Sequence, residues 1–147
     1  MSPTVIIDAN KSTMFFGKNQ NLKTLFEYIQ KSGMLKIQTG GTTLLGEYKK
    51  TSSILQILSA FEQAGLVNSV RNETVDAEEG ELKNNEDCRS NDLHIIALAR
   101  TSRARILVSD DRLLGLDFND PGLVSAPRGF VYKDDEHFAP MKKRFKL

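Results

Sequence analysis

The sequence is poor in the features that mark secreted, membrane-spanning or disulfide-stabilised proteins. Its 147 residues include one cysteine, Cys88, and no tryptophan. A single cysteine excludes a disulfide within one chain and makes a reducing cytoplasm the expected compartment. No run approaches 18 apolar residues, and no basic segment followed by an apolar core opens the chain. We therefore expect neither a membrane span nor a secretion signal.

An excess of one charge is also absent, since the sequence has 20 Lys and Arg residues and 19 Asp and Glu residues. This balance neither favours nor excludes nucleic acid as a partner. The distribution is uneven, because acids gather in residues 73–87 while the last seven residues contain four bases. A basic tail of this kind can hold a phosphate backbone, although an ordinary solvated terminus has the same composition.

The apolar pattern predicts strands that alternate with helices. Short apolar runs typical of buried strands cover residues 4–8, 35–38, 66–70, 105–109 and 129–132. Apolar residues at helical spacing cover residues 22–29, 44–48, 52–64, 91–99 and 111–116. This alternation predicts an α/β fold with a mainly parallel central sheet flanked by helices.

The length and composition predict a single domain over residues 1–135, followed by a basic C-terminal tail over residues 136–147. Residues 71–91 are polar, acidic and nearly free of large apolar side chains. We interpret them as a surface excursion with a helical turn around Ala77–Leu82. Such long connections are often functional, and too little chain follows for a second core.

Four acids stand out by their position in this pattern. Asp8 ends the first strand-like run, Asp92 opens a strongly apolar helix, and Asp111 follows the run 105–109. Glu47 lies inside a predicted helix. Ligands of parallel sheets bind beyond the carboxyl ends of the strands, so we expect Asp8 and the Asp110–Asp111 pair to share one site.

The phrases that contain these acids resemble the PIN-domain family of small bacterial endoribonucleases, which includes toxins of toxin–antitoxin pairs. The resemblance runs from Val5 to Tyr132 and is carried by IIDAN (6–10), GEY (46–48), NDLHIIALA (91–99), ILVSDD (106–111) and PRGFVY (127–132). It implies a three-layer PIN-like fold. It also implies a catalytic and metal-binding set made of Asp8, Glu47, Asp92 and Asp111.

The resemblance also implies supporting residues around these acids. Asn10 and Ser109 are expected to hold the acids in place, with Asp110 as a neighbour of the site. Nearby bases are candidates for contacts with the substrate backbone, and an ordinary surface charge is the alternative for each of them. These bases are Lys11, Lys49, Arg89 and Arg112.

Converging carboxylates need a compensating positive charge. Two unit charges ~4 Å apart repel by about 4 kcal/mol at an effective dielectric of 20. Oxygen ligands favour Mg²⁺ or Mn²⁺, and two histidines with one cysteine provide no cluster for zinc. We expect Asp8 and Asp92 as direct ligands, Asp111 as a direct or water-mediated ligand, and Glu47 opposite them. His94, within an apolar helix, is interpreted as a packed residue.

The sequence therefore predicts a cytoplasmic, Mg²⁺- or Mn²⁺-dependent endoribonuclease with RNA as its substrate. An antitoxin-like protein and a second copy of the chain are further candidate partners. The alternative is a PIN-like module that binds RNA or a protein without cleaving, which would not need four acids. DNA stays open as a substrate, because a metal site does not read the 2′-hydroxyl. Other α/β phosphohydrolases fit less well, since Asp8-Ala9-Asn10 lacks the two-acid motif of haloacid dehalogenase-like enzymes.

Overall fold

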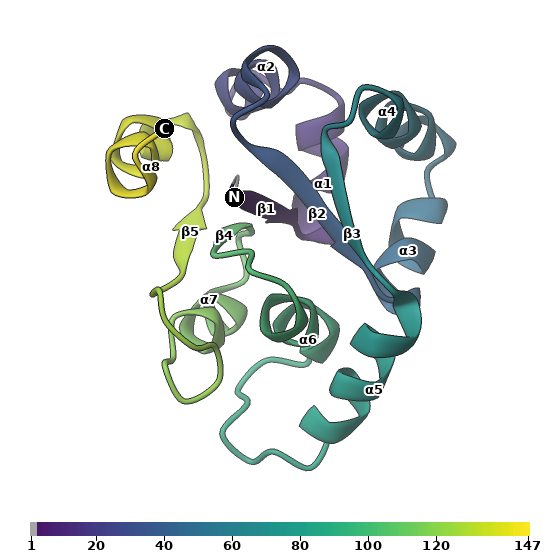
Figure 1. Cartoon of the computed structure of the whole chain (residues 1–147), viewed down its shortest axis with the longest axis vertical. Coiled ribbons are helices and arrows are strands. Elements are labelled where there is room, and N and C mark those ends of the chain that lie inside the picture. The colour runs from purple at the N-terminus through teal and green to yellow at the C-terminus, as the bar shows by residue number, and fades with distance from the viewer. Residues whose placement is uncertain (1–2) are drawn as a thin grey trace.

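The structure, a computed structural model, describes residues 3–147 and is built around a five-stranded sheet (Figure 1). The strands are β1 (Thr4–Ile7), β2 (Lys36–Gly40), β3 (Val67–Val70), β4 (Ile106–Val108) and β5 (Phe130–Tyr132). Their order is β3-β2-β1-β4-β5, and every neighbouring pair is parallel. The prediction of an α/β fold with a mainly parallel sheet is confirmed.

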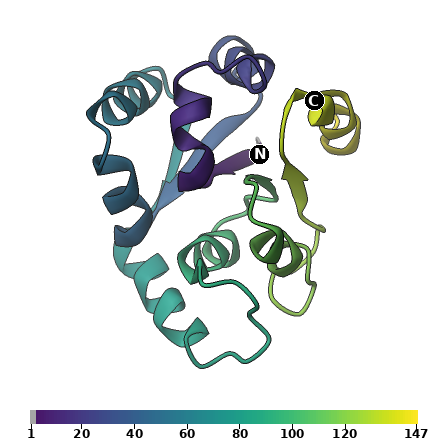
Figure 2. The ribbon, with the colours of Figure 1, turned by 180° about the vertical axis from the view of Figure 1, so that it is seen from behind.

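Helices cover both faces of this sheet. They are α1 (Ala9–Phe16), α2 (Lys23–Ser32), α3 (Thr42–Lys49), α4 (Ser52–Gln63), α5 (Asn72–Leu82), α6 (Leu93–Thr101), α7 (Arg112–Phe118) and α8 (Phe138–Phe145). Helices α1 to α4 gather on one side and α5 to α7 on the other, as Figure 2 shows from behind. This is the expected three-layer arrangement, consistent with a PIN-like fold.

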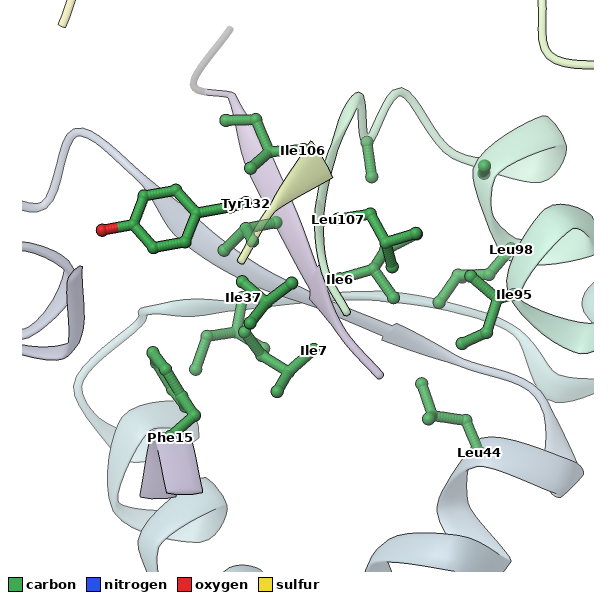
Figure 3. Packing of buried hydrophobic residues seen from close by; sticks show 14 of the residues in the cluster. Ile6, Ile7, Phe15, Ile37, Leu44, Ile95, Leu98, Ile106, Leu107 and Tyr132 are labelled. Atoms are coloured by element: carbon green, nitrogen blue, oxygen red, sulfur yellow. The ribbon is translucent and has the colours of Figure 1, made fainter. Parts of the chain in front are cut away.

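The central strands are apolar because both of their faces are covered. All four residues of β1 and all three of β4 are buried. Successive side chains of a strand point to opposite faces. Figure 3 shows this alternation at Ile7, which lies on the side of Phe15, and at Ile6, which lies on the side of Leu98. A buried parallel strand therefore has a continuous apolar run in place of an alternating one.

Three segments differ from the sequence expectation. Helix α1 was not expected, yet Phe15 and Phe16 are buried there. Within the predicted excursion, residues 72–82 form the whole of helix α5, which buries Val75 and packs against α6. The predicted tail contains α8, whose Met141 is fully buried and whose Arg144 donates to the carbonyl oxygen of Gly129. Both polar segments thus form part of the packed structure.

Within residues 3–147, no helix combines the length and the apolar character that crossing a bilayer requires.

The sheet brings the ends of β1 and β4 together. Ile7 pairs with Val108, and the backbone N–H of Asp8 donates to the carbonyl oxygen of Val108 at 3.0 Å. The residues that follow these two strands therefore start from neighbouring positions, although about a hundred residues of chain separate them. This edge is where the candidate site is built.

Candidate active site

Ser109 links two of the predicted acids at this edge. Its hydroxyl donates to Oδ2 of Asp8 at 2.7 Å and accepts the backbone N–H of Asp111 at 3.0 Å. Both Asp8 and Ser109 are buried, with exposed fractions of 3 % and 0 %. Because the Ser109 hydroxyl both donates and accepts a hydrogen bond, it holds the buried Asp8 carboxylate in one orientation.

Asp111 and Asp92 both precede helices, but they use their carboxylates differently. Oδ1 of Asp111 accepts the N–H of Leu114 at 3.1 Å and so caps helix α7. Asp92 stands at the same position before α6 and makes no such cap. Burial and then the nearby carboxyls of Asp8 and Asp111 raise its pKa, so the Asp92 carboxyl lies close to both. The Asp92 carboxyl is thus directed at the other acids.

Glu47 faces the site from helix α3 and is paired with His94 of α6. Oε1 of Glu47 lies 2.7 Å from Nε2 of His94, whose ring is buried. The next residue, Tyr48, donates its hydroxyl to the carbonyl oxygen of Ile7 and so fixes α3 to the end of β1. Because Glu47 lies on α3 and His94 on α6, this pair connects the two helical layers beside Asp8.

Burial and neighbouring charges raise the pKa of two of these acids, Asp8 and Asp92. Burial raises the pKa of Asp8, the Ser109 hydrogen bond lowers it, and the nearby Glu47 carboxylate raises it further. Burial, the charge of Asp8 and the hydrogen bond with Asp111 raise the pKa of Asp92 to about 6, against the nearby His94. Neighbouring carboxylates thus make Asp8 and Asp92 harder to ionise, as expected where several acids meet.

This donor set fits a hard divalent cation by its chemistry. The ligands on offer are carboxylate oxygens, and their repulsion would be relieved by a bound positive charge as well as by a proton. In the described residues, no three Asp, Glu, His or Cys side chains stand in the arrangement of a metal site. Burial and the nearby Asp8 and Asp111 instead favour the protonated form of Asp92. A cation would take the place of the proton that Asp92 binds.

Of the other expected residues, Asp110 and Lys11 are paired with each other, whereas Lys49 and Arg112 are exposed. Asp110 is exposed, and its carboxylate forms an ion pair with the buried Lys11 at 2.8 Å. Lys49 is exposed on α3, the helix that also carries Glu47. Arg112 is exposed at the start of α7, directly after Asp111. These positions leave Lys49 and Arg112 accessible to an anionic substrate.

Three expected residues are placed away from the roles assigned to them. Lys11, expected to contact a substrate, is buried and paired with Asp110. Asn10 is exposed in the first turn of α1 and makes no hydrogen bond to the acids in the described part of the chain. The guanidinium of Arg89 binds the carboxylates of Asp117 and Asp120 at 3.0 and 3.3 Å. The Arg89 guanidinium is therefore held against Asp117 and Asp120, and its contact with a substrate stays a prediction.

His94 was interpreted as a packed helix residue, and it is buried as expected. Its contact with Glu47 was not expected from the sequence. A signal was present, because His94 follows Asp92 by two residues at the start of α6 and so lies near the same strand ends. Its partner on α3 depends on the packing of two helices, which periodicity does not specify.

Comparison of the chain with models of protein families gave no match, and a search of curated proteins gave none either.

Proposed function

We propose that this chain is a metal-dependent endoribonuclease of the PIN type, which hydrolyses phosphodiester bonds in RNA. The observation that supports this proposal most is the convergence of Asp8, Asp92 and Asp111 at one edge of a parallel sheet. Burial and neighbouring carboxylates raise the pKa of Asp8 and of Asp92, and acids perturbed in this way cluster at functional sites. The resemblance of their surrounding sequence to the PIN family gives the choice of reaction.

In this proposal Asp8, Asp92 and Asp111 hold Mg²⁺ or Mn²⁺, and Glu47 faces them from α3. A divalent cation bound by these acids would activate a water and would neutralise charge on the phosphate being cut. Ser109 orients Asp8, and His94 orients Glu47. Lys49 and Arg112 attract the phosphate backbone from the exposed rim. An antitoxin-like protein, a second copy of the chain and a cytoplasmic location belong to the same proposal.

A cleavage assay tests this proposal directly. Labelled single-stranded RNA and DNA are incubated with the wild-type protein in Mg²⁺, Mn²⁺ or EDTA, beside Asp8→Asn and Asp92→Asn. We expect RNA cleavage that stops in EDTA and falls more than roughly 100-fold in both variants, beyond the 10–100-fold effect of outer-shell changes. Glu81→Gln removes one exposed charge from α5 and serves as the control with wild-type activity.

Cleavage that persists in EDTA, or in both Asp variants, would contradict the proposed site. RNA binding without cleavage in any metal would favour the binding-only module. Equal cleavage of DNA would widen the substrate class without changing the site.

A further inference from the structure

Asp117 is a buried acid outside the converging set, and it is the most completely bonded carboxylate near the site. It lies on α7 and is 0 % exposed. Its two oxygens accept the backbone N–H of Arg89, at 3.1 and 2.9 Å, and the backbone N–H of Ser90 at 2.9 Å. The Arg89 guanidinium adds a further bond at 3.0 Å. A charge buried in this way is stable only while these donors stay in place.

The segment that Asp117 binds leads directly to the candidate site. Ser90 is buried, and its hydroxyl accepts the backbone N–H of Asp92 at 3.0 Å. Hydrogen bonds therefore run from Asp117 through Ser90 to Asp92. In the described structure, the hydrogen bonds that residues 84–91 make to distant parts of the chain end at Asp117 or Asp120.

These bonds explain how Asp92 can face other acids. A residue that precedes a helix usually uses its side chain to cap that helix. Asp92 does not, so its position comes from its backbone, and that backbone is held by Ser90. The carboxyl is then available to Asp8 and Asp111. Without this support, the irregular segment before α6 has little regular structure to fix it.

We propose that Asp117 is a positioning residue of the acidic site, which sets the place of Asp92 by clamping the backbone of Arg89 and Ser90. The clamp joins α7, which Asp111 caps, to the start of α6. It thus fixes the relative placement of Asp92 and Asp111, which directly precede these two helices. The functional consequence of this inference rests on the proposed nuclease function, whereas its structural part does not.

Asp117→Asn tests the clamp, because an amide has nearly the shape of a carboxylate but replaces one acceptor oxygen by an NH₂ donor. That donor would face the backbone N–H groups of Arg89 and Ser90, which it cannot bind. We expect Mn²⁺ affinity, followed by electron paramagnetic resonance, to fall by about 10- to 100-fold, as for outer-shell partners of metal sites. Ser90→Ala leaves Asp117 intact and breaks only the last link, so we expect a smaller loss in the same direction. This second variant keeps the test decisive if Asp117→Asn does not fold.

Two controls separate positioning from general destabilisation. Asp120→Asn removes the outer partner of Arg89 and leaves the backbone clamp in place, so Mn²⁺ affinity should match the wild type. Phe61→Leu loosens the core at the Phe26–Phe61 ring contact, on the opposite side of the sheet, and should lower stability without changing Mn²⁺ affinity. If Phe61→Leu weakens Mn²⁺ binding as much as Asp117→Asn does, the role of Asp117 is only structural and the proposal fails.

Amide hydrogen exchange in EDTA gives a readout that does not depend on metal or activity. In Asp117→Asn, we expect exchange at Ser90 and Asp92 to rise by at least roughly tenfold, while β1 and β4 stay protected. Unchanged exchange at these amides would overturn the clamp. A wild-type protein that binds no Mn²⁺ would contradict the proposed function, and the exchange measurement would then decide on the clamp alone.

Discussion

Burial and neighbouring charge together determine what each acidic side chain of the site can do. Asp8 is held by Ser109 and shielded from water, whereas Asp92 is less buried but faces more charge. Glu47 differs from both, because its carboxylate is hydrogen-bonded to the imidazole ring of His94. These differences give each residue a distinct response to mutation.

The Glu47–His94 pair should contribute a measurable coupling energy to stability. Removing one partner leaves the other in a partly buried place without its hydrogen bond, which costs about 1–3 kcal/mol. We expect His94→Ala and Glu47→Gln to destabilise by amounts that do not add in the double variant, with a coupling of about 1–2 kcal/mol. Urea unfolding of the four proteins in EDTA measures this energy. Additive effects would show that the two side chains act independently.

Asp92 should make the metal-free protein more stable as the pH falls toward 4. Its pKa is about 6 in the folded protein and near 3.8 in the unfolded chain, so the folded state binds the proton more tightly. Folding is therefore favoured progressively as pH falls through 6 toward 4. Since solvent screens a partly exposed carboxyl, we expect only about 1 kcal/mol, or roughly 3 °C in melting temperature.

Comparison with Asp92→Asn isolates this effect, because the variant has no carboxyl to protonate. Melting curves of both proteins in EDTA at pH 7.5 and pH 5 give the difference. Asp87→Asn, which changes an exposed acid in the same way, should follow the wild type. A pH response of Asp92→Asn equal to that of the wild type would assign the effect to other groups.

At the scale of helices and strands, the sequence predicts elements whose pattern is local. The continuous apolar runs of β1 and β4 and the apolar helix after Asp92 need no information from the rest of the chain. Helix α5 was predicted only in part, because most of its side chains are polar and its support comes from α3 and α6. In the same way, the sequence predicts the four acids, but the hydrogen bonds of Asp117 to Arg89 and Ser90 depend on how α7 packs against a distant segment.

Helix α3 illustrates such non-local support. Its N-terminal Gly41 has no side chain to cap the helix and adopts a φ of 94°. The cap comes from α5, where Oδ1 of Asp76 accepts the N–H of Thr42 at 2.9 Å and Oδ2 accepts its hydroxyl. Because Val75 packs 2.8 Å from the place of a Cβ on Gly41, only glycine lets the two helices approach so closely.

Asp76→Ala should therefore destabilise the protein by about 1 kcal/mol, the usual cost of losing a helix cap. The Thr42 hydrogen bonds lower the pKa of Asp76, so this contribution exists above pH 4 and is lost as the pH falls through the lowered pKa. Urea unfolding at pH 7 and pH 3 measures both effects. Glu81→Ala, on the same helix, is the matched control and should cost little. Equal stability of Asp76→Ala and wild type at pH 7 would exclude the cap.

At the scale of the whole molecule, the site gathers residues from both layers around the sheet. Asp8 follows β1, Glu47 comes from the layer of α1 to α4, and Asp92 and Asp111 precede α6 and α7 of the other layer. Figure 1 labels these elements. Such a set exists only in the folded chain, since the unfolded chain separates these acids by tens of residues. A ligand that binds them together must therefore stabilise the fold as a whole.

Mn²⁺ should accordingly raise the melting temperature of the wild-type protein. At 100 times the dissociation constant, binding to the folded state alone contributes about 2.7 kcal/mol. In a chain of this size we expect a rise of roughly 5–10 °C. In Asp92→Asn most of this rise should disappear, although the metal-free variant starts from equal or greater stability at neutral pH because one repelling charge is gone. Glu81→Gln should respond like the wild type. The same Mn²⁺ shift in Asp92→Asn and wild type would mean that the ion binds elsewhere, and the converging acids would then need another partner.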